Sequence, residues 1–158
     1  MIYIKNLIFR TCIYLKNKYK FVKIQIYEKT FGNIKFNLST PNLFYSVLKN
    51  IPENSTILDF GCGSGVCYKK QSTIDLIIEK KLNITGIDIN KYDIENFIKT
   101  NPFAKNIDLR YGDILTENFT SKFDYVIFSE SAPLLSKNSL IKIISHIKYN
   151  LLNSNGKI

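Results

Sequence analysis

Residues 57 to 66 read ILDFGCGSGV, an apolar run that contains one acid, Asp59, and leads into three glycines at alternate positions, Gly61, Gly63 and Gly65. The apolar run is typical of a central strand in a parallel sheet. Glycines directly after a strand let the backbone turn sharply and approach a ligand without a Cβ in the way. A helix that follows would point its free N–H groups at the same place. The stretch therefore predicts a strand, a ligand-binding loop and a helix.

Apolar runs and amphipathic segments alternate along the rest of the chain. A helix is expected to begin near Thr40 and Pro41, because threonine can cap it and proline suits its first position, and to end by Pro52. Beyond this helix, strands are expected at 56–60, 84–89, 106–111 and 123–129, and helices at 73–82, 92–100 and 138–152. This alternation predicts a doubly wound, mostly parallel α/β sheet of the Rossmann-like kind, with helices on both faces.

The last residues are expected to begin a further strand. The sequence NSNG (153–156) is interpreted as the end of the preceding helix, and Lys157 and Ile158 as the first residues of a fifth strand. On this interpretation the chain ends as that strand begins. An unpaired sheet edge would then be left exposed.

Positive charge is concentrated in the first 35 residues. The 158-residue chain has 22 basic and 13 acidic residues and a net charge of +9, and residues 1–35 hold eight of the basic residues and one of the acids, Glu28. The sequence predicts a basic amphipathic leader, residues 1–35, and one ligand-binding domain, residues 36–158. The leader could contact a membrane surface or nucleic acid. The high lysine content could instead reflect a gene rich in A and T.

The cysteines suggest a reducing compartment. Cys12, Cys62 and Cys67 are odd in number and form no C-x-x-C pair, which indicates neither a disulfide framework nor a metal site. Basic residues interrupt the apolar leader, so that no run approaches the roughly 18 residues of a membrane span. No small-residue cleavage site follows it. A cytoplasmic location is expected, with association of the leader with a membrane surface as an alternative.

The spacing of the glycines separates two classes of ligand. A dinucleotide fingerprint reads G-x-G-x-x-G, but here the sixth position from Gly61 is Val66 and the third glycine comes one place early. The D-x-G-x-G-x-G pattern at 59–65 instead resembles the first motif of class I S-adenosylmethionine (SAM)-dependent methyltransferases. Further segments that resemble motifs of this family, in order, are GIDIN (86–90), YGDI (111–114), FDYVIFSES (123–131) and LLNSNGKI (151–158). The resemblance covers roughly residues 41–158. It implies that the chain is truncated at the start of the fifth strand, and that the C-terminal strands of the family's sheet are missing.

The resemblance implies SAM as the cofactor and a role for each matching position. The loop of Gly61, Gly63 and Gly65 would surround the methionine end of SAM, and Asp59 would face its α-ammonium group. Asp88 would accept hydrogen bonds from the two ribose hydroxyls, as a carboxylate can. The remaining cofactor-binding positions implied by the family lie at the ends of the next strands: Asp113 at the adenine amine, Ile89 and Ile114 on either side of the base, and Ser129 beside the reacting methyl group.

The resemblance implies a SAM-dependent methyltransferase acting on a small molecule, a lipid or a protein. Glu130 is the candidate catalytic residue, as a base or a substrate-orienting carboxylate, and a loop cap is its alternative role. The segment SESAP (129–133) lacks the paired prolines and the aromatic residue of enzymes that methylate exocyclic amines of DNA bases. It also resembles protein arginine methyltransferases, but Ser139 stands where their second glutamate is expected.

Two other functions remain open from the sequence. The first is a truncated, non-catalytic protein of the SAM-binding fold that binds a partner through its open sheet edge. The second is a nucleic-acid methyltransferase that uses the basic leader as a phosphate clamp.

Overall fold

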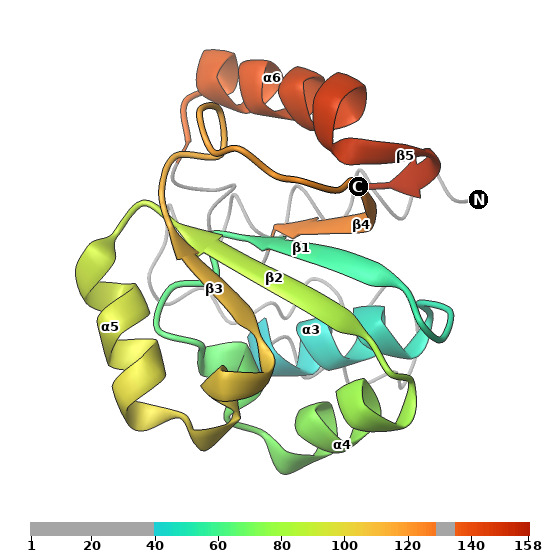
Figure 1. The fold of residues 1–158 in the computed structure, drawn as a ribbon, viewed down its shortest axis with the longest axis vertical. Coiled ribbons are helices and arrows are strands. Elements are labelled where there is room, and N and C mark those ends of the chain that lie inside the picture. The colour runs from blue at the N-terminus through green and yellow to red at the C-terminus, as the bar shows by residue number, and fades with distance from the viewer. Residues whose placement is uncertain (1–39, 129–134) are drawn as a thin grey trace, which may run out of the picture. The chain divides into compact units, whose positions relative to one another are not determined.

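The structure is a computed structural model, and it describes residues 40–128 and 135–158. Five parallel strands form one sheet in the order β3-β2-β1-β4-β5 (Figure 1). Their bounds are β1 Thr56–Phe60, β2 Asn83–Asp88, β3 Asp108–Tyr111, β4 Phe123–Phe128 and β5 Leu152–Lys157. The strand order reverses between β1 and β4, which makes the carboxyl end of β1 the topological switch point where such sheets bind ligands. The predicted doubly wound fold is confirmed.

Helices cover both faces of the sheet. Figure 1 shows α3, α4 and α5 on one side and α6 on the other. The helical elements are α3 Thr40–Lys49, η1 Val66–Tyr68, α4 Gln71–Glu79, α5 Lys91–Thr100, η2 Pro102–Asn106, α6 Lys137–His146 and the π-helical turn η4 Ile147–Leu151. Each of the predicted helices has its counterpart, with ends displaced by a few residues.

The pleat of β1 divides the core into two hydrophobic clusters. Ile57 packs with Phe44 and Leu48 on the α3–α4–α5 side, whereas the next residue, Leu58, packs with Ile143 and Ile147 on the α6 side. Successive side chains of a strand point to opposite faces, so a strand buried on both faces is apolar at consecutive positions. This burial explains why the sequence around Asp59 is a continuous apolar run.

The C-terminal end of α3 is closed by a lysine from another element. The Lys80 ammonium, just after α4, donates hydrogen bonds to the carbonyl oxygens of Leu48 (3.3 Å), Lys49 (2.7 Å) and Ile51 (2.6 Å). Leu48 and Lys49 belong to the last turn of α3, whose carbonyls lack an intrahelical partner, and a cation there also opposes the helix dipole; Ile51 follows the helix. Lys80 thereby fixes α3 against α4.

A fifth strand is present, but its predicted start at Lys157 was wrong. NSNG does not end a helix that runs to 152: α6 ends at His146, η4 follows, and β5 already begins at Leu152. Phe123 of β4 pairs with Leu152 of β5, and Tyr125 pairs with Lys157. An advance of two residues on β4 thus corresponds to an advance of five residues on β5. A Cβ on Gly156 would lie 2.8 Å from Leu152 Cδ2 and 3.1 Å from the Phe123 carbonyl oxygen. The turn-like residues therefore form a bulge within the strand.

Asp124 connects three strands at the amino end of the sheet. Its Oδ2 accepts hydrogen bonds from the backbone N–H and the hydroxyl of Thr56, both at 2.9 Å, and its Oδ1 accepts one from Asn153 Nδ2 at 2.8 Å. The Thr56 N–H, followed by the Asn153 amide, holds the pKa of Asp124 below its ordinary value. The ionised carboxylate thus stabilises the pairing of β4 with β1 and β5.

The expected basic leader, residues 1–35, lies outside the described residues, and the division of the chain at residue 36 stays a prediction. Among the residues that the structure does describe, no helix is both long enough and apolar enough to cross a membrane.

Candidate functional site

The glycine loop leaves the carboxyl end of β1 with three residues in the left-handed region. The φ angles are 74° at Gly61, 52° at Gly63 and 70° at Gly65. A Cβ on Gly65 would lie 2.3 Å from the ring of Phe97 in α5, whereas a Cβ on Gly63 would meet no atom within 4 Å. Gly65 is therefore required both for its conformation and for close packing, and Gly63 for its conformation alone.

Asp88, the last residue of β2, holds this loop in place. Its Oδ2 accepts a hydrogen bond from the Gly63 N–H at 2.9 Å, and its Oδ1 accepts one from the Asn90 N–H at 2.8 Å. The backbone N–H of Gly61 adds a bond of 2.8 Å to the carbonyl of Ile87. The predicted cofactor residues Gly63 and Asp88, 25 positions apart in sequence, are thus in direct contact.

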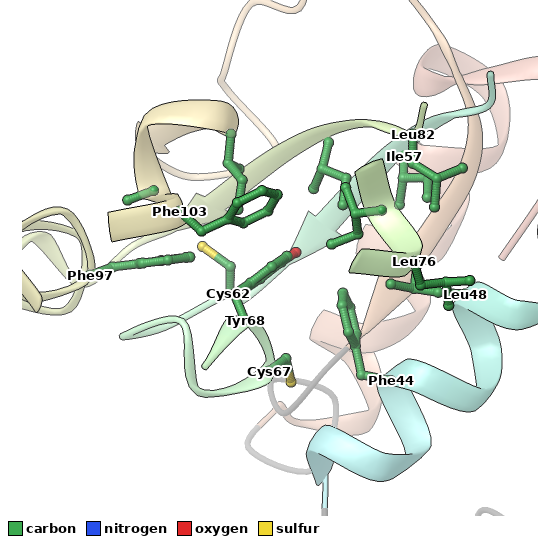
Figure 2. Packing of buried hydrophobic residues seen from close by; sticks show 14 of the residues in the cluster. Phe44, Leu48, Ile57, Cys62, Cys67, Tyr68, Leu76, Leu82, Phe97 and Phe103 are labelled. Atoms are coloured by element: carbon green, nitrogen blue, oxygen red, sulfur yellow. The ribbon is translucent and has the colours of Figure 1, made fainter. Parts of the chain in front are cut away.

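Asp59 and Tyr68 form a buried pair beneath the loop. Both side chains are 0% exposed, and the Tyr68 hydroxyl donates a hydrogen bond of 2.8 Å to Asp59 Oδ2. Figure 2 shows Tyr68 among its aromatic neighbours: its ring stacks on Phe97 with centroids 5.3 Å apart and meets Phe44 edge-on at 5.1 Å. Burial, and then the charge of Asp59, raise the pKa of Tyr68 well above its ordinary value, so the hydroxyl stays protonated and keeps donating.

A pocket of about 250 Å³ opens beside the loop. Its lining residues come from the loop, from η1 and from the first turn of α5: Gly61, Cys62, Gly63, Ser64, Val66, Cys67 and Asp93. Asp93 was not predicted as a site residue. It stands five places after Asp88 in a polar helix start, and only the fold brings it to the glycine loop.

The loop carries a negative electrostatic field. Burial comes first among the causes that raise the pKa of the Cys62 thiol, and the charges of Asp59 and then Asp88 add to the effect. The thiol therefore stays protonated and is not activated as a nucleophile. Three carboxylates, Asp59, Asp88 and Asp93, surround a loop that itself lacks a basic residue. Such a field favours a ligand that carries positive charge.

The residues predicted to hold adenine lie at the ends of β2 and β3. Asp113 closes a turn: its Oδ1 accepts from the Leu115 N–H at 3.0 Å and its carbonyl accepts from the Thr116 N–H at 2.9 Å. The Gly112 N–H bonds the Asp88 carbonyl at 3.0 Å, so the two strand ends are adjacent. Ile89 is 71% exposed, but Ile114 is 1% exposed and belongs to the α6-side core. Their contacts with adenine stay predictions.

The described part of β4 ends at Phe128. Ser129, the expected neighbour of the reacting methyl group, and Glu130, the candidate catalytic residue, lie outside the described residues. Of the predicted site residues, the structure therefore brings the glycine loop and Asp88 into contact, and the roles of Ser129 and Glu130 stay predictions.

Residues 51–157 match a protein family described as a methyltransferase domain. This match extends over more than half of the chain. The chain belongs to this methyltransferase family, and its sheet is the Rossmann-like fold of class I SAM-dependent methyltransferases.

This chain aligns with only part of the length of each relative. Over 121 residues, 72% of this chain and 46% of the relative, the chain is 28% identical to tRNA1(Val) (adenine(37)-N6)-methyltransferase of Vibrio vulnificus. The solved structure of PKMT2 from Rickettsia typhi is 27% identical, with a TM-score of 0.53 over 74% of this chain and 23% of that one. The glycopeptide N-methyltransferase MtfA, solved with SAM, is 15% identical and shares the fold, with a TM-score of 0.57 over 74% of this chain and 51% of MtfA. This chain spans less than half the length of the curated relatives it matches.

Proposed function

We propose that this chain binds SAM beside the Gly61–Gly65 loop and transfers its methyl group to an acceptor. The observation that carries the proposal is the left-handed glycine loop, fixed by Asp88 at the switch point of the sheet and open to a pocket. SAM supplies a methyl group already activated on a sulfonium, so the protein mainly has to bind, orient and exclude water.

The negative field of the loop supports SAM over a dinucleotide. SAM carries positive charge on its sulfonium and its ammonium group, whereas a dinucleotide would bring an anionic pyrophosphate to the same loop. Asp59, Asp88 and Asp93 would stabilise the cation and repel the anion. Neither the sulfonium nor the ammonium would need a basic residue in the loop.

Asp88 retains the capacity that a ribose ligand needs. An ionised carboxylate offers about four acceptor positions. Two of them are used by the N–H groups of Gly63 and Asn90. Two remain for the two hydroxyls of a ribose, while the bonds to the backbone keep the carboxylate fixed before the ligand arrives.

For Asp59 we propose an electrostatic role. Its bond to Tyr68 fixes the carboxylate below the loop, where its charge would favour the α-ammonium group of SAM. Asp93 lines the pocket and would add to the same attraction. Neither group has to exchange a proton during methyl transfer.

The acceptor that we favour is a small molecule, a lipid or a protein, with Glu130 as the residue that orients it or takes its proton. A nucleic-acid acceptor is the second candidate, because one relative is a tRNA adenine methyltransferase that shares 28% identity. Turnover assays with radiolabelled SAM on these acceptor classes would separate the two.

Calorimetric titration tests cofactor binding. The dialysed full-length protein is titrated with SAM and with its demethylated product S-adenosylhomocysteine, and heat from at least one of them is expected. Asp88→Ala should weaken binding at least tenfold, since it removes both the acceptor and the support of the loop. Asp75→Ala is the matched control, because Asp75 is an exposed acid on α4 that bonds Gln71. No heat from either ligand would contradict the proposal, and so would equal affinities of the two variants.

A further inference from the structure

The outward side of α6 and η4 carries lysines without an acidic neighbour on the same elements. We call it the α6 outer face and define it by its exposed residues: Lys137, Asn138, Ile141, Lys142, Ser145, Lys148 and Tyr149. Tyr149 is 71% exposed, and the Lys148 ammonium lies 5.5 Å from the centroid of its ring. The opposite side of the same helix, with Ile143, Ile147 and Leu151, is buried against the sheet. Burial of this apolar side fixes the orientation of the helix, and the lysines on its other side face solvent.

The charge of the described domain is segregated onto this end of the chain. Residues 40–128 contain ten basic and eleven acidic residues and are close to neutral. Residues 135–158 contain four lysines, Lys137, Lys142, Lys148 and Lys157, and no acid. The positive charge of the described residues is thus an attribute of α6, η4 and β5, and it would attract a polyanion to this side of the sheet.

We propose that the α6 outer face binds a nucleic-acid strand. Its lysines would neutralise successive phosphates, and the exposed ring of Tyr149 would stack on a base. The combination of a basic track with an aromatic platform is the usual chemistry of sequence-tolerant binding to single strands. Neighbouring polar side chains, Asn138 and Ser145, add hydrogen-bonding groups between the lysines.

The first turn of α6 lies toward the end of the sheet that carries the pocket. The helix α6 follows β4 and so begins toward the carboxyl end of the sheet, where the glycine loop lies, and η4 delivers the chain to Leu152, which pairs with Phe123 at the amino end of β4. A strand on the face would therefore extend along the sheet toward the end that carries the pocket.

An anionic membrane fits the same charge less well. A helix that lies on a membrane needs a continuous apolar side turned toward the lipid. The apolar side of α6 is already buried in the core, and the exposed apolar residues, Ile141 and Tyr149, are about two turns apart. The face therefore offers lysines and a single ring, without an apolar surface to insert.

The inference goes beyond the proposed function, since it needs neither methyl transfer nor a particular acceptor. The test compares two full-length variants that remove the same charge. One carries Lys137→Gln, Lys142→Gln and Lys148→Gln on the α6 outer face. The control carries Lys99→Gln, Lys105→Gln and Lys122→Gln, which are exposed lysines of α5, η2 and the segment before β4. Glutamine keeps helix propensity, and circular dichroism with urea unfolding checks that both variants fold.

Fluorescence anisotropy with a labelled single-stranded RNA supplies the measurement. The α6 variant should lose at least tenfold in affinity and the control less than about twofold. The slope of log K against log salt should fall by about two for the α6 variant, from about 0.7 per lost phosphate contact to a single strand. Tyr149→Leu, made in the wild-type chain, should also weaken RNA binding but leave the salt slope unchanged, since stacking is not ionic.

Three results would overturn the inference: no RNA binding by the wild type, equal losses in the two variants, or binding to phosphatidylserine vesicles that depends on α6 while RNA binding does not. Calorimetry with SAM is run on the same preparations. Loss of the SAM signal would count against the proposed cofactor site and leave the RNA result standing, so the two proposals can fail separately.

Discussion

Tyr68 and Asp59 form a buried, hydrogen-bonded polar pair beneath the glycine loop. Replacing Tyr68 by phenylalanine would leave a fully buried carboxylate without this donor. We expect Tyr68→Phe to lower the free energy of unfolding by about 1–3 kcal/mol. Tyr149→Phe, at a ring that is 71% exposed, should change it by less than about 0.5 kcal/mol. Urea unfolding at neutral pH measures both, and equal values would argue that the hydroxyl contributes nothing.

The same pair should give a signature at alkaline pH. The folded pKa of Tyr68 is raised above its ordinary value of 10.0, so the protonated form is favoured by folding. The resulting stability is fully present below pH 10.0 and is lost as the pH rises toward the folded pKa. The difference in unfolding free energy between wild type and Tyr68→Phe should therefore shrink above pH 10. A difference that grows with pH would contradict this assignment.

Two glycines of one loop should respond differently to the same substitution. Gly63→Ala meets no atom, and only its left-handed conformation should cost about 1 kcal/mol. Gly65→Ala adds overlap with the Phe97 ring and should cost more than about 2 kcal/mol. Urea unfolding of both variants measures the contrast, and Phe97→Leu should recover part of the Gly65→Ala loss. Equal costs, or no recovery, would show that Phe97 does not restrict position 65.

At the scale of single residues, the motif residues could be predicted from the sequence, but the residues that contact them from η1 and α5 could not. Asp88 and Gly63 could be predicted because the motif spacing marks both. Tyr68 and Asp93 could not, because a tyrosine nine residues after Asp59 and an acid in a helix start have no distinctive local pattern. Their roles arise from contacts between η1, α5 and the loop that exist only in the folded chain.

At the scale of the elements, Asp124 makes the contacts of β4 with β1 and β5 sensitive to acid. Its folded pKa is lowered from an ordinary value of 3.8, so its contribution is present above pH 3.8 and is lost as the pH falls through the lower folded value. Asp124→Ala should cost about 1 kcal/mol at pH 7 and progressively less below pH 3.8. Unfolding followed from pH 7 to pH 2, with Asp75→Ala as a control, checks the sign. A cost that is constant with pH would exclude the ionic contribution.

Elements defined by burial could be predicted well, and those defined by pairing alone could not. β1 occupies the predicted residues 56–60 because its interior side chains are buried on both faces of the sheet. In β5, the residues Asn153 to Asn155 are exposed and polar, so nothing in their sequence distinguishes a strand from a turn. Its hydrogen bonds to β4 and the bulge at Gly156 define the strand, and neither follows from local propensity.

At the scale of the whole molecule, a bound cofactor should raise stability. A ligand that binds only the folded state at 100 times its Kd adds about 2.7 kcal/mol to the free energy of unfolding. SAM should therefore shift the urea midpoint of the full-length chain upward, and Asp88→Ala should abolish most of the shift at the same SAM concentration. A midpoint that does not move at saturating SAM would contradict binding to the native state.

The overall architecture followed from the alternation of strands and helices, because each βα unit has to bury one face of its helix against the sheet. The segregation of charge onto α6 was not predicted. In the sequence the excess of positive charge is concentrated in residues 1–35, and only the orientation of α6 shows that its lysines share an exposed side.

The contact between Gly65 and Phe97 has a consequence for divergence within the family. Because the ring occupies the space that a Cβ at position 65 would need, the two positions should covary among homologues. A side chain at 65 should coincide with a small residue at 97, and a glycine at 65 with an aromatic one. Independent variation of positions 65 and 97 among homologues would mean that the loop can pack against α5 in other ways.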